Sequence, residues 1–111
     1  DAFKDIDGLI IPFVNQADTE PVYHIFPTML PEGMDRMQVI EILKREGVQS
    51  SIHYPMMQDF SAFKDYKLDE TPLARSISTR ELTLPLYPTM TDEEVDIVIA
   101  AFRLALQEAR K

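Results

Sequence analysis

A helix stop signal that runs directly into a strand-like segment constrains the fold of this chain more than any other feature. Gly47 stands where a preceding helix would end in the left-handed conformation, and Val48 can fold back on that helix as its apolar contact. Small and β-branched residues follow and predict a strand over residues 48–53. A helix that turns back along a strand in this way is typical of folds in which helices cover a sheet.

Three further strands are expected. Two apolar runs, over residues 9–14 and 22–30, each contain a proline, Pro12 or Pro27. Because proline cannot donate to a β-ladder, both runs favour positions at a sheet edge. A third, shorter strand is predicted over residues 82–86.

Three helices are predicted from their N-terminal residues. Asp35, Thr71 and Thr91 stand at N-cap positions, and Pro72 suits the first turn of the second helix. Capping boxes in the first and third helices are expected to be closed by Gln38 and Glu94. The stripes expected to be buried are Met37, Val39, Ile40 and Leu43, then Leu73, Ala74 and Ile77, then Val95, Val98, Phe102, Ala105 and Ala109.

The resulting order is strand, strand, helix, strand, helix, strand, helix. It predicts an α+β fold, a two-layer sandwich with a small, mostly antiparallel sheet and helices on one face. At 111 residues the chain suits one core, so residues 1–111 are expected to form a single domain. The irregular segment 55–68 carries several methionines and aromatic residues, which predict that it packs down on the domain around one helical turn.

The amino-acid composition argues against several classes of binding partner and site. The net charge is −8, which argues against nucleic acid and anionic membranes as partners because both attract basic surfaces. No apolar run reaches the roughly 20 residues that a membrane span needs. Cysteine is absent, which excludes disulfides and thiolate metal sites and fits a cytoplasmic protein. The first residue is Asp1 and not methionine, so we expect a piece of something longer.

His53 and Tyr54 are the best candidates for a site, because they follow directly from the predicted strand 48–53. A half-buried structural histidine and a core tyrosine ring are the alternative. His24 is expected to be a hydrogen-bonded structural histidine, and two histidines so far apart in sequence do not indicate a metal site. The acids at residues 92–94 are explained by helix capping.

None of the lysines has the sequence context expected of a Schiff-base lysine. A Schiff-base enzyme needs a lysine that is desolvated and lowered in pKa. All five lysines of this chain lie in polar sequence contexts: Lys4, Lys44, Lys64, Lys67 and Lys111. No catalytic and no cofactor-binding residue is therefore expected in this chain.

Several short motifs, in this order and spacing, resemble the C-terminal small domain of the DegT/DnrJ/EryC1/StrS family of pyridoxal-phosphate-dependent sugar aminotransferases. The similarity covers about residues 22–106 and rests on Tyr23-His24-Ile25-Phe26, Leu43 to Val48, Ile52-His53-Tyr54-Pro55, Ala62-Phe63, Leu84-Pro85-Leu86-Tyr87-Pro88 and Thr91 to Asp96. The resemblance implies the small domain of a fold-type-I aminotransferase, whose large domain, absent from this chain, holds pyridoxal phosphate and its lysine.

The resemblance also implies partners and a site. The longer enzyme is expected to be a homodimer acting on a nucleotide-linked keto-sugar with an amino-acid donor. His53 and Tyr54 would approach the substrate, while the isolated chain would be inactive and would bind no pyridoxal phosphate. Gln58 stands where family members commonly have a second histidine, and an amide there keeps hydrogen bonding but cannot titrate.

Two alternatives stay open. The chain can be a stand-alone α+β binding or regulatory module, or the small domain of a pyridoxal-phosphate-dependent sugar dehydratase. A domain cut from a larger enzyme should expose an apolar patch where it met its partner. That patch is expected to include Ile6, Leu9, Ile10 and the segment 56–63.

Overall fold

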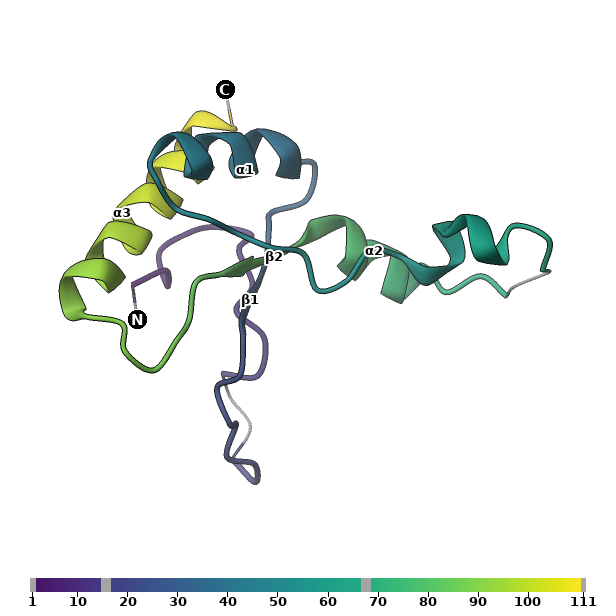
Figure 1. Ribbon diagram of the computed structural model, residues 1–111, viewed down its shortest axis with the longest axis horizontal. Helices are drawn as coiled ribbons and strands as arrows, with labels where there is room; N and C mark the ends of the chain where they lie inside the picture. The colour runs from purple at the N-terminus through teal and green to yellow at the C-terminus, as the bar shows by residue number, and fades with distance from the viewer. Residues whose placement is uncertain (1, 15–16, 67–68, 111) are drawn as a thin grey trace.

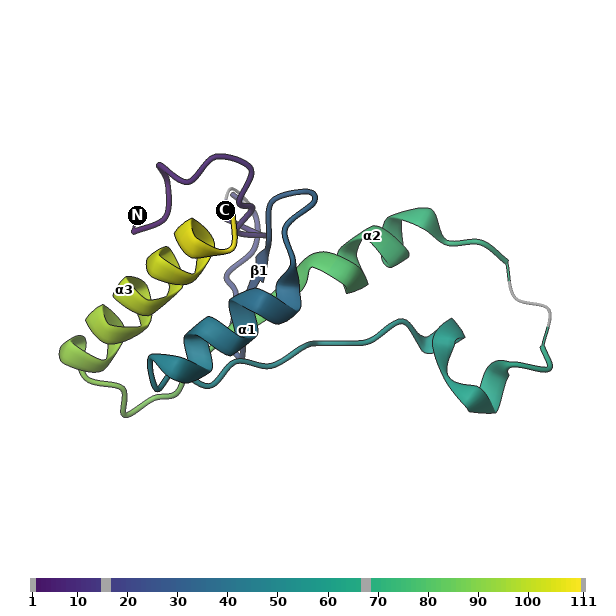
Figure 2. The same cartoon turned by 90° about the horizontal axis from the view of Figure 1, so that it is seen from above.

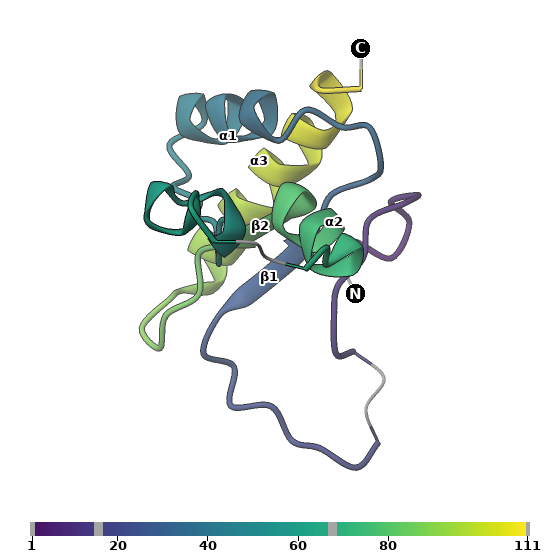
Figure 3. The same cartoon turned by 90° about the vertical axis from the view of Figure 1, so that its right-hand side faces the viewer.

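The computed structural model describes residues 2–14, 17–66 and 69–110 and has the α+β architecture expected from the sequence. Helices α1 (Arg36–Arg45) and α3 (Asp92–Glu108) lie on the same side of a small sheet, as Figures 1 and 3 show. Helix α2 (Pro72–Arg80) extends away from that layer, so the helices are not all gathered on one face. Within the described ranges, no helix is both long and apolar enough to cross a membrane.

The sheet is smaller than the sequence predicts. Strands β1 (Phe26–Met29) and β2 (Glu81–Leu84) pair antiparallel, with Phe26 opposite Leu84 and Met29 opposite Glu81. The predicted strand over residues 9–14 is reduced to one antiparallel bridge, Ile10 with Met29. The predicted strand over 48–53 is likewise reduced to one bridge, Ser51 with Thr83.

The first of these corrections has a local physical reason. Pro12 has no N–H to donate, and Phe13 has a φ of 66°, which turns the backbone out of the extended conformation. In the predicted second strand, residues 22–25 also precede β1 without pairing, and Tyr23 has a φ of 50°. Among the described residues, continuous pairing is therefore confined to the short stretch where β1 and β2 face each other, and Ile10 and Ser51 add one bridge each.

The core lies between the sheet and helices α1 and α3. Phe102 is completely buried at its centre, and the ring of Phe3 packs against it edge-on with 5.3 Å between centroids. Met37, expected inside, is 58% exposed because it lies about 200° around the helix from Val39. The buried apolar residues are Leu30, Val39, Ile42, Leu43, Val48, Leu82, Leu84, Ala101, Phe102, Ala105 and Leu106.

The helix ends largely follow the sequence signals. The Asp35 carboxylate accepts the N–H groups of Met37 and Gln38, but Gln38 does not complete a box. Thr91 and Glu94 form the expected capping box of α3. At the end of α1, Gly47 has a φ of 78°. The N–H of Gly47 donates to Lys44 and that of Val48 to Leu43, which satisfies two carbonyls of the last turn.

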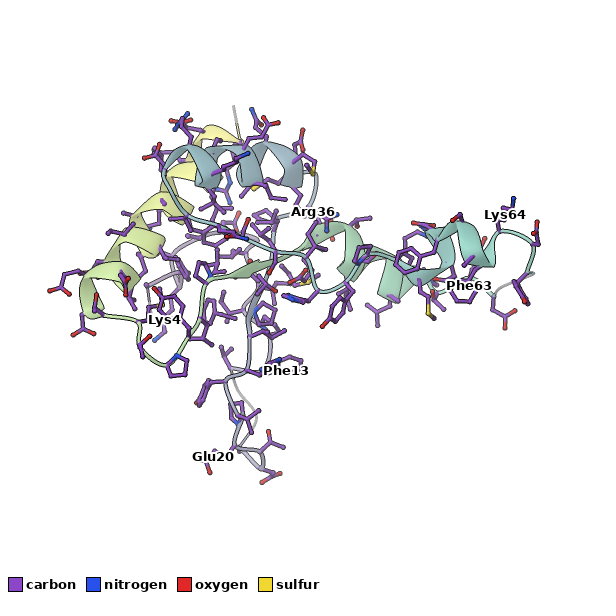
Figure 4. All side chains as sticks on the ribbon, in the orientation of Figure 1. Lys4, Phe13, Glu20, Arg36, Phe63 and Lys64 are labelled. Carbon is purple, nitrogen blue, oxygen red and sulfur yellow. The ribbon has the colours of Figure 1, made fainter. Side chains whose placement is uncertain are left out.

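The segment 55–66 does not pack down on the domain as expected. Together with α2 it forms an arm that projects from the sheet, as Figures 1 and 2 show. The arm contains two single turns of 3-10 helix, η1 (Met57–Asp59) and η2 (Ser61–Phe63), and Figure 4 places Phe63 and Lys64 far out on it.

The predicted buried stripe of α2 is wrong for the same reason. Leu73 is 74% exposed and Ile77 is 42% exposed, and Ala74 is exposed too. Within α2 only Ser78 is buried. The helical spacing identifies an apolar face, but among the described residues no other element buries Leu73 and Ile77 on that face.

The N-terminal segment is attached to the domain through α3. The guanidinium of Arg103 donates to the carbonyl of Ala2 and to the carboxylate of Asp5. These hydrogen bonds lower the pKa of Asp5 below its ordinary value. Ile6 and Leu9 pack against the core, so they do not contribute to the exposed patch expected there, whereas Ile10 is 51% exposed.

Candidate functional site

One open hollow, of about 600 Å³, brings together residues from distant parts of the chain. It is bordered by the end of α1, the segment around Ser51, the end of β2 and the first turns of α3. Its polar side chains include His24, His53, Tyr87 and Glu94, and apolar side chains such as Leu86 and Ile97 complete the lining. The two histidines of the chain, 29 positions apart in sequence, therefore border the same space.

His53 is held at the edge of this hollow by β2. Its ring nitrogen Nδ1 lies 2.9 Å from the hydroxyl of Thr83, and its backbone N–H donates to the carboxylate of Glu81 at 2.7 Å. The Thr83 hydroxyl in turn donates to the other oxygen of that carboxylate. Glu81 and Thr83 are only 3% and 5% exposed, so these hydrogen bonds satisfy two buried polar side chains.

Tyr54 lies beside His53 but outside the hollow. Neighbouring residues of a strand would point to opposite sides of the chain, but the rings of His53 and Tyr54 meet edge-on with 4.9 Å between centroids. Alternation applies to residues paired in a ladder, and pairing in this segment is limited to Ser51. The Tyr54 ring is 74% exposed, so the domain itself does not bury it.

Gln58 is placed elsewhere, on the arm. Its amide donates to the carbonyl of Asp69 and to the hydroxyl of Thr71, at 3.1 and 2.9 Å. It borders a second, separate hollow, which lies on the arm and is lined in part by α2. The structure thus brings His53 and Tyr54 together but does not bring Gln58 to the same hollow.

His24 is not the hydrogen-bonded structural histidine that the sequence suggested. It is exposed, and within the described residues it makes no hydrogen bond. The reason is that residues 22–25 pair with no strand in the described part of the chain, which leaves the imidazole on the surface at the border of the hollow.

Glu94 does more than cap a helix. Its carboxylate accepts the backbone N–H of Thr91 at 2.9 Å and also a hydrogen bond from the Tyr87 hydroxyl. The backbone bond and the phenol lower the pKa of Glu94, and the carboxylate raises the pKa of Tyr87. Both side chains border the hollow, which gives its wall a fixed carboxylate and phenol pair.

The sequence did not single out Glu81, Thr83 or Tyr87 as site residues. The alternation Glu81-Leu82-Thr83-Leu84 does signal that Glu81 and Thr83 share one face of a strand. Nothing in that alternation signals that His53 lies against this face, because the contact spans 30 positions.

Neither a metal-binding cluster nor a shielded lysine is found among the described residues. Among them no three His, Asp or Glu side chains converge as a metal site would require. The lysines at positions 4, 44 and 64 are all exposed, so none of these three offers the desolvated amine of a Schiff-base lysine. Lys67 and Lys111 lie outside the described residues.

Comparison with known proteins gives consistent matches. The chain is 36% identical over 109 residues to the spore coat polysaccharide biosynthesis protein SpsC of Bacillus subtilis, covering 92% of this chain and 28% of that protein. It is 29% identical over 109 residues to the dTDP-4-amino-4,6-dideoxy-D-glucose transaminase of Escherichia coli, covering 93% and 28%. The PMP-form of a Streptococcus pneumoniae protein described as a sugar aminotransferase superposes with a TM-score of 0.86 at 26% identity, over 97% of this chain and 28% of that one.

The chain therefore spans about 28% of the length of these relatives. The model of one protein family matches residues 1–103, which is nearly the whole chain. On this match, the chain belongs to the DegT/DnrJ/EryC1/StrS aminotransferase family.

Proposed function

We propose that this chain is the C-terminal small domain of a pyridoxal-phosphate-dependent aminotransferase that acts on a nucleotide-linked keto-sugar with an amino-acid donor. The observation that carries the proposal is the family match over residues 1–103. The Escherichia coli relative, named as a transaminase of a dTDP-linked amino sugar, supports this substrate class. In this role the domain closes the substrate side of a cleft whose other side lies in the remainder of a longer polypeptide.

The described residues of this chain do not supply the lysine that pyridoxal phosphate needs. That cofactor needs a lysine amine shielded from water, and the described lysines are exposed on the surface. The proposal therefore places the cofactor, its lysine and its phosphate contacts in the remainder of the polypeptide. What this chain supplies is polar side chains for the sugar.

His53 and Tyr54 are the side chains proposed to meet the substrate. His53 borders the hollow and is fixed by Thr83 and Glu81, so its ring is positioned before any ligand arrives. The exposed phenol of Tyr54 adds a polar group next to it. Gln58, on the arm, stays a prediction as a substrate contact.

Two projections of the domain carry apolar side chains that a domain of a larger protein would bury. On the arm, Met57, Phe60, Tyr66 and Leu73 are each at least 45% exposed. The other projection is the loop before β1, on which Figure 4 labels Phe13. Its exposed apolar side chains are Phe13, Val14, Val22 and Tyr23, each at least 67% exposed. We assign the remainder of the polypeptide as the surface that covers both projections, because most of the length of each relative lies outside this chain.

Pyridoxal phosphate added to the 111-residue chain tests the placement of the cofactor. We expect no imine absorption band, and a stoichiometric band that borohydride fixes on one lysine would contradict the proposal. The same experiment on the full reading frame that contains these residues should give the band and sugar-dependent transamination.

A reading frame without a cofactor domain would instead favour a stand-alone binding module. A full frame that binds cofactor but only dehydrates its sugar would identify the dehydratase branch.

In a full frame that is active, Leu73→Ser should weaken the assembled enzyme. Met37→Ser, which removes an exposed apolar side chain from α1, is the matched control.

A further inference from the structure

Three side chains form a continuous hydrogen-bonded line that ends at His53. Glu81 and Thr83 are two positions apart on β2 and therefore point to the same face of the strand. The backbone of Thr83 pairs with Ser51 through two hydrogen bonds of 3.1 and 2.8 Å. This pairing brings His53, two residues after Ser51, alongside the Thr83 hydroxyl.

Counting protons along this line fixes the direction of each hydrogen bond. In its carboxylate form Glu81 has no proton on either oxygen and can only accept. It accepts the backbone N–H of His53 at one oxygen and the Thr83 hydroxyl at the other. A hydroxyl has one proton, so Thr83 has none left for the imidazole, and its oxygen must accept from His53 Nδ1.

We propose that Glu81 and Thr83 are positioning residues that hold neutral His53 with its proton on Nδ1, so that Nε2 is an unprotonated acceptor. The geometry leaves Nε2 available, because within the described part of the chain it makes no hydrogen bond while His53 borders the hollow. Glu81 and Thr83 are buried, so the domain shields their end of the line from water, while His53 is half-buried.

With its proton on Nδ1, His53 can form a hydrogen bond through Nε2 with only some ligand groups. An unprotonated Nε2 accepts from a hydroxyl or an amine, and it cannot donate to a carbonyl or a phosphate oxygen. Resting on the proposed function, His53 therefore meets a sugar hydroxyl or the amino group of the sugar, and not its keto oxygen or the diphosphate. The tautomer of the neutral ring does not depend on that function.

A long-range proton–nitrogen NMR spectrum of the 111-residue chain, under alkaline conditions that keep imidazoles neutral, tests the proposal. The chain has only two histidines, so a His24→Gln sample assigns the signals. The nitrogen that couples to both ring C–H protons is Nε2. We expect it to resonate in the unprotonated range for His53, and an Nε2 signal in the protonated range would overturn the proposal.

A reversal of the tautomer provides the sharper test. In Glu81→Gln, the amide oxygen can still accept the His53 N–H, which turns the NH2 group toward Thr83. The Thr83 hydroxyl then donates to Nδ1, and His53 should switch to the Nε2-protonated form. Ser51→Ala is the matched control, because the Ser51 hydroxyl is also near Nδ1 but at 3.5 Å, and it should leave the tautomer unchanged.

Each result decides the proposal. If Glu81→Gln keeps the proton on Nδ1, or if Ser51→Ala moves it, the line from Glu81 through Thr83 does not set the tautomer. If the Glu81 variant fails to fold, the wild-type spectrum still assigns the nitrogen that carries the proton. These spectra need neither cofactor nor sugar, so failure of the proposed aminotransferase function would leave them informative.

Discussion

The guanidinium of Arg75 and the carboxylate of Asp59 form a two-point ion pair, with both N–O distances at 3.1 Å. Arg75 belongs to α2 and Asp59 to η1, so the pair joins the outgoing and returning halves of the arm. The carboxylate raises the pKa of Arg75, which is charged at all ordinary pH values in any case. The amide of Gln58, bonded to Thr71, reinforces the same junction.

Arg75→Ala should loosen the arm without weakening the domain. Both partners are more than half exposed, so the pair adds little to global stability, while locally it holds η1 against α2. We expect amide exchange of residues 57–63 to accelerate and the thermal midpoint to stay close to wild type. Lys64→Ala, which removes a positive charge from the same arm, is the control, and equal acceleration in it would contradict this role of the pair.

Glu94→Gln should reduce the acid sensitivity of the domain. The pKa of Glu94 is lowered in the folded state, so its contribution is present above the ordinary value of 4.5 and is lost as the pH falls through the lower folded value. Thermal midpoints from about pH 7 to about pH 3 should fall more steeply in wild type than in the variant. Glu93→Gln is the control, and the same flattening there would assign the effect to the charge of the helix start and not to the Thr91 and Tyr87 contacts.

Phe102→Ala should destabilise the domain by about 3–5 kcal/mol, because it removes a ring from a fully buried site and leaves a cavity. The loss would also remove the edge-on partner of Phe3. Urea unfolding gives the free energy. Ile97→Ala, on the same helix at a position 56% exposed, should cost far less. Comparable losses in the two variants would show that the core is not centred on Phe102.

Gly47→Ala should cost about 1–2 kcal/mol through the backbone alone. The residue has a φ of 78°, and a Cβ added there would meet no atom within 4 Å. Gly47→Asn should cost less, because asparagine tolerates the left-handed conformation. Urea unfolding of both variants checks the order, and an asparagine variant as unstable as the alanine variant would point to a steric cause instead.

His53→Ala in the full-length enzyme should lower turnover on the sugar while cofactor content stays at the wild-type level. Loss of a substrate hydrogen bond of this kind costs about 1–3 kcal/mol. Steady-state kinetics with a spectroscopic count of bound pyridoxal phosphate measures both quantities. Ser61→Ala, on the arm, is the control, and cofactor loss as the main effect of the histidine change would show that His53 has another role.

The sequence by itself determined the parts of this fold that depend on near neighbours. The Asp35 cap, the Thr91 and Glu94 box and the left-handed Gly47 each depend on groups within five positions, so residue type and spacing are enough to predict them. The same holds for the existence of all three helices and for the α+β class. Motif order also sufficed to indicate the family.

Only the tertiary structure decided which apolar faces are covered and which polar groups meet. The stripe of α2 has the spacing of a buried face, yet Leu73 and Ile77 are exposed because burial depends on a partner element that spacing cannot specify. Strand length was overestimated for a similar reason, since a ladder needs a second strand in register along its whole length. The line from Glu81 through Thr83 to His53 joins residues up to 30 positions apart, and it exists because the single bridge between Ser51 and Thr83 sets their register.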